Sequence, residues 1–498
     1  MPTKFPLSRI VLAAATVLTL VALGIAQTSH SPLPLSPLSS SVLMTQAVRQ
    51  GKVHLTGAAN SHTRVANVTC SPAPCVLPNV NVSESAVLAN ETPVIVSPTN
   101  PSWILSGAND YACPNVQGFY ASSDGGSTWT RTCMNNLSGM SGEGDPGVGY
   151  DLRGNAYISG IDAAPSLVPG VIILESSTDN GQTWSAPRQA VPNMLGGLTD
   201  KPWMEIDTNR NSPFANSIYI SVTQFDATQN NTQISVSHSS DGGNTWTNVL
   251  VGKLQIFPAV DTFTDLAIGE DGTVYLSWMH CVANGPTGDC GGTKATMMFS
   301  ESKDGGNTWT APRAIFSANL VPDPNACCFY GSLPNTFERM SNIPVIAVDN
   351  SNSGRAGNLF IAFYTWTGQQ MRVYVARSLD GGTSWVAQPI SIITNDQFFP
   401  WLNISNQGHV GVTWDDRRND PANVNYESFA SILGHVPGTY PMVFDLSANP
   451  SNPFNDGFGG FFIGDYTGNA WGGSTLYNTY TDTSTGIDQD FMGGVELH

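Results

Sequence analysis

The sequence predicts an all-β protein with β-propeller architecture, built from seven four-stranded blades, with six blades as the alternative. A short segment that follows, with small variations, the pattern Ser-x-Asp-x-Gly-x-Thr-Trp occurs five times. β-like runs such as "RVYVAR" and "WTAPRAI" precede and follow these copies. The 498 residues include 49 Gly and 33 Pro, a composition that favours turns and short strands. Repeats at this spacing are typical of propellers and solenoids.

Residues 1–26 are predicted to be a secretory signal peptide. Lys4 and Arg9 form a basic start, and an apolar run follows from Ile10 to Ala26. An uncleaved membrane anchor is the alternative, although the run is at the short edge of what spans a bilayer. We therefore expect a secreted, periplasmic or extracellular protein with no membrane contact after the signal is cleaved.

Residues 27–75 are predicted to be a Pro/Ser-rich linker with an N-terminal extension, and residues 76–498 the propeller. The segment "SPLPLSPLSSS" at 31–41 is typical of a disordered linker.

Each repeat is predicted to be a tight turn between two strands. The carboxylate can accept N–H groups of the turn, and the second glycine can adopt a backbone angle that other residues avoid. The tryptophan begins the next strand and can cover the blade edge. We expect a structural and not a catalytic role for the five aspartates. They are Asp124, Asp179, Asp241, Asp304 and Asp380.

Seven inner-strand candidates give the blade count. They are "TPVIVSP", "GDPGVGYD", "DKPWMEID", "FTDLAIGED", "IPVIAVD", "FPWLNIS" and "FIGDYTGNA". The last unit has only three strands, so "NVNVSES" near residue 80 is predicted to supply its fourth. Such pairing closes the ring and protects the sheet edges.

The charge balance excludes some partners. The formal net charge is −18, and only 12% of the residues are charged. An acidic chain of this kind is a poor partner for nucleic acid or an anionic membrane, and it does not attract an anionic substrate over long range.

The five repeats resemble the Asp box, or BNR repeat, of the sialidase superfamily, and the resemblance covers roughly residues 76–498. In that family the box joins the third and fourth strands of a blade, on the face away from the active site. The resemblance implies a secreted glycoside hydrolase, or a related carbohydrate-active protein, that acts on extracellular glycans as a monomer. A non-catalytic propeller that binds glycans or proteins is the alternative.

With the boxes at the bottom, the loops that lead into the inner strands lie on top. Four of these loops carry an aspartate, and we expect the four to converge at the axial mouth, with Tyr466, Arg417 and Arg418 at its rim. Carboxylate pairs serve glycoside cleavage, one as acid and one as base or nucleophile. The four catalytic candidates are Asp145, Asp200, Asp265 and Asp465.

Neighbouring aromatic and polar residues are candidates for substrate binding, because ring faces stack on sugars and carboxylates accept from hydroxyls. The alternative is that each Asp caps its own turn and each Trp packs between blades. The binding candidates are Lys201, Trp203, Trp401, Trp414, Asp415 and Asp416.

The chain departs from the sialidase pattern in its arginines. Sialidases are expected to clamp the substrate carboxylate with three arginines, the first in an Arg-Ile-Pro motif. The nearest string here is "SNIP" at 341–344, with Asn in place of Arg. No cofactor is expected to be required. Clustered acids should raise one another's pKa, recruit a Ca²⁺ ion, or be neutralised by Arg417 or Arg418.

Eight cysteines in an exported protein predict disulfides. Cys281 and Cys290 are close enough for a local loop, as are Cys70 and Cys75. Cys113 and Cys133 fall in two top loops of one blade, so a bond between them is also expected. The adjacent Cys327 and Cys328 could bond to each other or pair elsewhere. No CxxC pair or His cluster suggests zinc or another metal.

Overall fold

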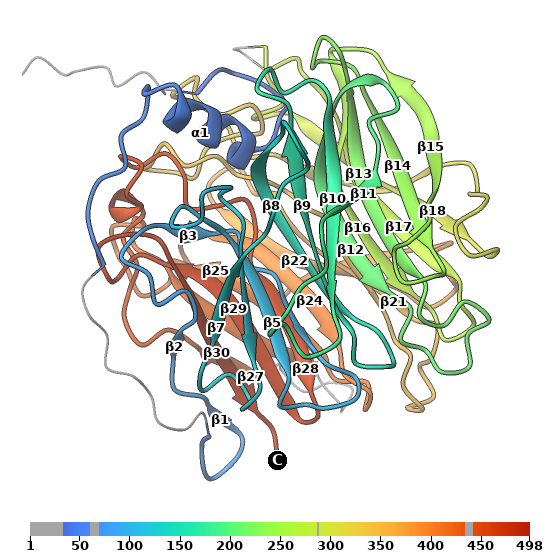
Figure 1. Ribbon diagram of the computed structural model, residues 1–498. Helices are drawn as coiled ribbons and strands as arrows, with labels where there is room; N and C mark the ends of the chain where they lie inside the picture. Colours follow the sequence, from blue (N-terminus) through green and yellow to red (C-terminus); the bar gives the residue numbers. More distant parts are fainter. Residues whose placement is uncertain (1–32, 60–68, 286–287, 434–441) are drawn as a thin grey trace, which may run out of the picture. The chain divides into compact units, whose positions relative to one another are not determined.

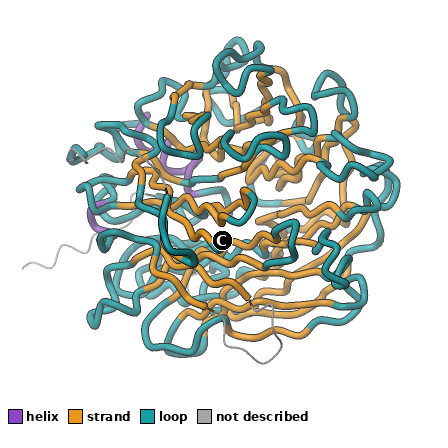
Figure 2. The backbone as a smooth tube through the Cα atoms, turned by 90° about the horizontal axis from the view of Figure 1, so that it is seen from below, coloured by secondary structure: helices purple, strands orange, loops and turns teal. Residues whose placement is uncertain are grey.

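Seven antiparallel sheets follow one another along the chain as the blades of a β-propeller (Figures 1 and 2). This confirms seven blades over six. The computed structural model describes residues 33–59, 69–285, 288–433 and 442–498. Ser31–His498 form one unit of contacts, and the predicted signal peptide lies outside the described residues.

The first four blades are consecutive along the chain. Blade 1 comprises β3 (Ala89–Asn90), β4 (Val94–Val96), β5 (Ile104–Asp110), β6 (Gly118–Ser122) and β7 (Thr130–Cys133). Blade 2 comprises β8 (Ser141–Tyr150), β9 (Ala156–Ala163), β10 (Gly170–Ser177) and β11 (Arg188–Val191). Blade 3 comprises β12 (Gly196–Ile206), β13 (Ile218–Asp226), β14 (Thr232–Ser239) and β15 (Thr247–Gln255). Blade 4 comprises β16 (Ala259–Ile268), β17 (Val274–Val282), β18 (Lys294–Ser302) and β19 (Arg313–Asn319).

Blades 5 and 6 follow the same order. Blade 5 comprises β20 (Val345–Val348), β21 (Leu359–Trp366), β22 (Met371–Ser378) and β23 (Val386–Pro389). Blade 6 comprises β24 (Gln397–Ile404), β25 (Val410–Asp416), β26 (Glu427–Leu433) and β27 (Met442–Asp445). A short 3-10 helix, η1 (Pro453–Asn455), precedes the last blade.

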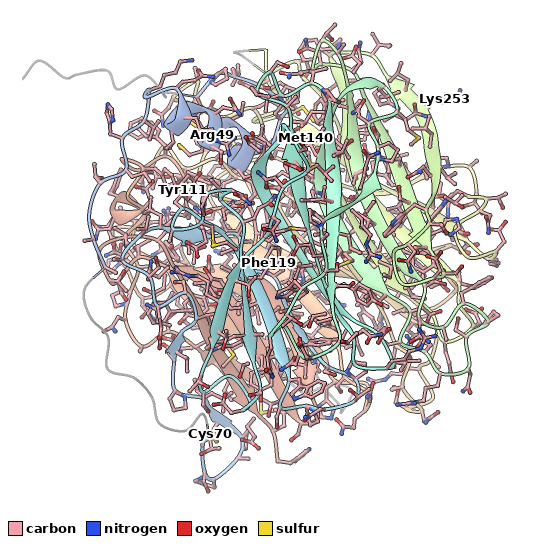
Figure 3. All side chains as sticks on the ribbon, viewed as in Figure 1. Arg49, Cys70, Tyr111, Phe119, Met140 and Lys253 are labelled. Atoms are coloured by element: carbon pink, nitrogen blue, oxygen red, sulfur yellow. A yellow bond between two sulfur atoms is a disulfide. The ribbon has the colours of Figure 1, made fainter. Side chains whose placement is uncertain are left out.

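Blade 7 is built from both parts of the chain, as the sequence predicted. Its strands β28 (Gly468–Gly472), β29 (Thr475–Asp482) and β30 (Gln489–Glu496) are followed in space by β1 (Cys75–Val76) and β2 (Val80–Asn81). Val80 pairs with Met492, so the "NVNVSES" segment closes the ring. The Cys70–Cys75 disulfide lies directly before this closing segment (Figure 3).

The five repeated turns join the third and fourth strands of blades 1 to 5, and their hydrogen bonds are local. In the third copy, Asp241 Oδ1 accepts from Thr245 N at 2.9 Å, and Asp241 Oδ2 accepts from the Thr245 hydroxyl at 2.7 Å. Gly243 has a φ of 80°, and the Trp246 indole donates to its carbonyl at 3.1 Å. The turn therefore needs Asp, Gly and Trp for its own geometry.

Burial follows position within a blade. Every residue of the middle strands β9 and β29 is buried, while the outer strands β15 and β23 are largely exposed. A middle strand is covered by neighbouring blades on both faces, so even its polar residues, such as Asp162 in β9 and Asn478 in β29, are buried. The seven inner strands line an axial cavity of about 450 Å³.

The prediction of a disordered linker at 31–41 is wrong. Helix α1 (Ser40–Arg49) begins in this segment and packs against β8 (Figure 1). The Ser39 side chain caps the helix by accepting from Val42 N at 3.2 Å. Val42 and Met44 are fully buried, so tertiary packing stabilises a helix that would be marginal alone.

Four disulfides join all eight cysteines. The expected Cys113–Cys133 and Cys281–Cys290 bonds are confirmed. Cys327 and Cys328 bond to each other, which settles the alternative left open by the sequence. Across the described residues, the helices are too short or too polar to cross a membrane.

Candidate functional site

A recurring bulge shapes the axial ends of the inner strands. The pairing register shifts in β8, β12, β16 and β24 of blades 2, 3, 4 and 6. At each shift one non-glycine residue has a positive φ, a conformation that costs free energy and bends the strand. These residues are Asp145 (54°), Lys201 (53°), Phe263 (59°) and Phe399 (46°).

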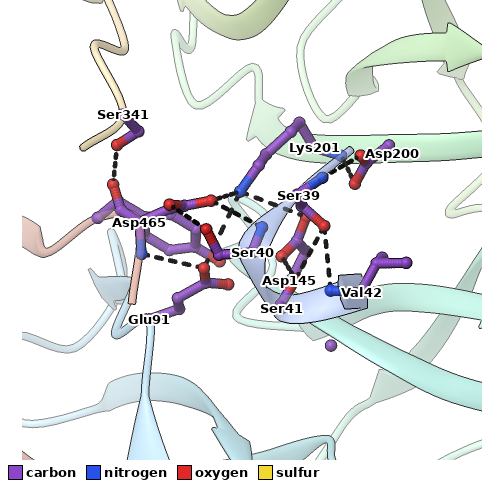
Figure 4. A network of polar contacts seen from close by, with 12 residues as sticks. Ser39, Ser40, Ser41, Val42, Glu91, Asp145, Asp200, Lys201, Ser341 and Asp465 are labelled. Atoms are coloured by element: carbon purple, nitrogen blue, oxygen red, sulfur yellow. Dashed lines mark hydrogen bonds and ion pairs between the residues drawn. The ribbon is translucent and has the colours of Figure 1, made fainter. Parts of the chain in front are cut away.

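Lys201 is the centre of a cluster of acids from four blades (Figure 4). Its ammonium forms an ion pair with Asp465, in the loop before β28. It lies 3.9 Å from an oxygen of Glu91 in blade 1 and 3.9 Å from Asp145 in blade 2. Glu91 Oε1 also accepts from the Asp465 backbone N–H at 3.0 Å. Residues far apart in the sequence are thus brought to one point.

Arg339 supplies the second positive charge. It comes from the long loop between β19 and β20, and its guanidinium lies 3.5 Å from Asp465 Oδ2. Lys201 and Arg339 thus place two positive charges beside the acids. A bound Ca²⁺ ion was one of the alternatives expected from the sequence for offsetting the acids. Calcium binding stays a prediction.

The N-terminal end of α1 covers this cluster. Ser39 N donates to Asp200 Oδ2 at 2.7 Å, and the Ser40 hydroxyl donates to Asp465 Oδ1 at 3.0 Å. The Ser41 hydroxyl donates to Asp145 (Figure 4). A helix N-terminus is a favourable partner for carboxylates because its N–H groups and its dipole both point at them.

The segment before α1 is held by the long loop after β19. The Tyr330 hydroxyl donates to the carbonyl of Pro37 at 2.8 Å, and Arg339 donates to the carbonyl of Leu38. As a result the acid cluster is buried, and Lys201, its most exposed member, is only 6% exposed.

The pKa values of the acids in the cluster are shifted in opposite directions. Burial and the neighbouring Asp145 raise the pKa of Glu91 well above its ordinary value, and they raise the pKa of Asp200 to about 7. Burial would also raise the pKa of Asp465, but Lys201 and Arg339 outweigh it and hold that pKa below its ordinary value. The surroundings therefore favour the protonated form of Glu91 and the ionised form of Asp465. Paired environments of this kind separate a general acid from a base or nucleophile.

Of the four predicted aspartates, the structure brings together Asp145, Asp200 and Asp465 but not Asp265. The bulge residue of β16 is Phe263, so Asp265 lies two residues further along its strand. There its Oδ2 accepts from Ile346 N at 2.6 Å, and it lines the axial cavity with Glu205. The prediction that Asp265 shares the cluster is wrong. The position of Asp265 in the sequence resembles that of Asp145 and Asp200, but the bulge at Phe263 places it further along its strand.

Three predicted aromatic residues meet one another beside the cluster. The ring centroids of Trp203 and Trp401 are 4.4 Å apart, and Tyr466 lies 5.8 Å from Trp203. The Tyr466 hydroxyl donates to the carbonyl of Pro146 at 3.3 Å, and burial raises its pKa well above the ordinary value. Trp203 and Trp401 line the axial cavity, while the Tyr466 phenol stays protonated.

Arg417 does not reach the axial mouth, contrary to prediction. It is fully buried, donates to the carbonyls of Pro334 and Asn423, and lies 3.7 Å from Asp396. These contacts fix the loop after β25.

Arg418 and its predicted neighbours also pack within blade 6. Arg418 pairs with Asp416 at 2.6 Å and lies over the Phe429 ring. The fully buried Trp414 donates to Asp416 at 2.7 Å. Asp415 is buried, and its burial and the nearby Asp482 raise its pKa. For Trp414 the alternative of packing within the propeller fits the contacts.

Sequence reasoning missed Glu91 and the three serines of α1. Glu91 directly precedes the inner-strand candidate "TPVIVSP". The rule that picked out Asp145 and Asp200 would have found it if applied to the first blade. The serines carried no such signal.

No family model matches the chain. A curated sialidase from Bacteroides fragilis is 24% identical over 327 residues, which cover 60% of this chain and 53% of that protein. The chain thus spans about half the length of the curated relative it matches.

Several solved structures are similar. A Hadza microbial sialidase has a TM-score of 0.43 at 15% identity, covering 67% of this chain and 65% of that one. An α-L-arabinofuranosidase from Fusarium graminearum has a TM-score of 0.43 at 11% identity, covering 71% and 92%. An intramolecular trans-sialidase from Ruminococcus gnavus has a TM-score of 0.46 at 10% identity, covering 72% and 94%. The seven-bladed ring and the curated relative together show that the chain is similar to sialidase-like β-propellers.

Proposed function

We propose that the protein is a secreted glycoside hydrolase that acts on neutral glycans at the axial acid cluster. The observation that carries the proposal is the convergence of Glu91, Asp145 and Asp465, from three different blades, on Lys201. Glu91, whose surroundings favour its protonated form, can donate to a leaving-group oxygen, and Asp465 can act as base or nucleophile.

A neutral sugar fits this cluster better than an anionic one. Four carboxyl groups face only Lys201 and Arg339 among the described contacts of the site. An arginine triad that would clamp a substrate carboxylate is not gathered by the described residues. Trp203 and Trp401 pack against each other and line the axial cavity, and aromatic surfaces of this kind bind sugars.

The test is a panel of aryl glycosides, including α-L-arabinofuranoside, β-galactoside and sialoside, with the purified chain. Because α1 covers the acids, a Ser41→Glu variant is assayed beside the wild type. Hydrolysis of a neutral glycoside that falls at least 100-fold per folded molecule in Asp465→Asn and in Glu91→Gln supports the proposal. Preferred cleavage of the sialoside contradicts the neutral substrate class.

A binding function is the second candidate, because the cluster is closed by the chain's own helix. A glycan array separates the two candidates. A glycan that binds the Ser41→Glu variant without being cleaved favours a binding propeller.

A further inference from the structure

The contacts of α1 are those of a ligand in a site. Its first turn gives backbone N–H groups and hydroxyls to three carboxylates that belong to three different blades. Tyr330 and Arg339 hold Pro37 and Leu38, the two residues before the N-cap Ser39. Each of these hydrogen-bond partners is a polar group of the proposed active site or of the loop beside it, while the apolar side chains Val42, Leu43 and Met44 pack against the propeller.

We propose that residues 33–53 form an autoinhibitory plug, in which Ser39, Ser40 and Ser41 occupy the position of substrate hydroxyls. The proposal rests on the proposed function for the identity of the site. The serine donors lie on consecutive residues, and the carboxylates accept from all three. The ligand that replaces them must likewise present several donors within a small volume, as neighbouring hydroxyls of a neutral sugar do.

The plug can leave without dismantling the propeller. All strands of the seven blades lie between residues 75 and 496, and α1 contributes no strand. The chain that follows α1 is exposed from His54 to Ala58. The first cysteine is Cys70, and the four disulfides join residues from there onward, so after a cut before Cys70 no covalent bond ties the segment to the propeller.

A cavity lies beside the plug. Leu38, Leu43 and Gln46 on the plug side face residues 165–167 and 228–230 across a cavity of about 470 Å³. The far end of α1 is tied to the propeller by Arg49 and Gln46, both of which contact Glu143. Displacement therefore requires loss of contacts at both ends of a 10-residue helix.

The experiment uses the full chain with a recognition sequence for a site-specific protease inserted after Ala59. The chain is cut under native conditions, and release of residues 1–59 is followed by size exclusion and mass spectrometry. Opening is read by carbodiimide-driven amidation of Asp145 and Asp200, with the exposed Glu270 as the internal reference. We expect both aspartates to be labelled at least tenfold faster after release, while labelling of Glu270 is unchanged.

Two further arms make the result specific. A synthetic peptide of residues 33–53 should restore protection when added back, whereas the same peptide with Ser39, Ser40 and Ser41 replaced by Ala should not. In the uncut chain, Ser41→Glu should raise labelling of Asp200 because its carboxylate is placed against Asp145. Gln50→Glu, which adds the same charge at the exposed end of the helix, should leave labelling unchanged.

Several results would overturn the plug. One is release of the segment with no faster labelling, and another is a segment that stays bound after the cut even in the Ser41→Glu background. A propeller that loses its near-UV circular dichroism when the segment leaves would make α1 part of the fold instead. Faster labelling without hydrolysis of any glycoside would support the plug and count against the proposed hydrolase alone.

Discussion

Arg49, in the last turn of α1, forms an ion pair with Glu143 in β8, 94 residues along the chain. Gln46 donates to the same carboxylate at 3.0 Å. Burial raises the pKa of Glu143 to about 7, and the nearby Asp162 adds to the rise, while Arg49 and Gln46 oppose it. The helix is therefore coupled to a titration near neutral pH.

This coupling predicts weaker docking of α1 as pH rises. A carboxyl whose pKa is raised from 4.5 to about 7 binds more protons in the docked state than when exposed. The contribution of Glu143 to docking of α1 is thus fully present below about pH 4.5 and is lost as the pH rises through about 7. Hydrogen exchange of residues 40–49, corrected for the intrinsic pH effect, should show lower protection at pH 8 than at pH 5. Glu143→Gln should flatten the difference, and equal or greater protection at pH 8 in the wild type would contradict the coupling.

Lys201→Met should strongly destabilise the fold at pH 8. The change leaves Asp145 and Asp465 buried without their central cation, a loss that typically costs about 3–5 kcal/mol. Urea unfolding measures the loss of stability. Lys303→Met is the control, because the Lys303 side chain is 72% exposed and forms a surface ion pair with Glu301. The control should change stability by less than about 0.5 kcal/mol. A loss below about 1 kcal/mol for Lys201→Met would mean that the acids do not depend on this lysine.

Asp241→Ala should lower stability by about 1 kcal/mol, the usual cost of losing a cap-like side chain that satisfies backbone N–H groups. Asp241 is exposed, so the loss comes from its bonds within the turn and not from burial. Glu270→Ala removes the same charge from an exposed turn and serves as control. A stable Asp241→Ala variant with abolished ligand binding would refute the structural role of the turn.

All eight cysteines should resist thiol titration under denaturing, non-reducing conditions, because each is bonded. Reduction should then release eight reactive thiols. Peptide mapping should recover Cys113–Cys133 as one linked pair. Two or more free thiols in the unreduced protein would contradict this disulfide pattern.

The fold could be read from the sequence because its signals are local. Each turn such as the one at Asp241 completes its hydrogen bonds within a few residues, so the letters repeat wherever the geometry does. The closing strand was predictable because the last unit of the sequence holds only three strands, and the segment near Val80 can supply the fourth.

The site was harder to predict because it depends on register and on distant packing. Asp145 and Asp200 were found by their place before an inner strand, but the same reasoning misplaced Asp265 because a bulge leaves no mark in the letters. α1 was missed because its Pro/Ser-rich start resembles a linker. A helix of that length is stabilised by the socket it enters, and no local pattern describes that socket.

The two-part construction of blade 7 sets the order of events during synthesis. β1 and β2 leave the ribosome long before β30, the strand with which they pair. Asp465, a partner of Ser40, is likewise made almost last. The contact between Ser40 and Asp465 therefore cannot form until nearly every blade has been made, although the partners of α1 in blades 2 and 3 are made earlier. Complete binding of α1 therefore requires a complete ring. In an incomplete or wrongly closed ring, the N-terminal segment would lack its contact with Asp465.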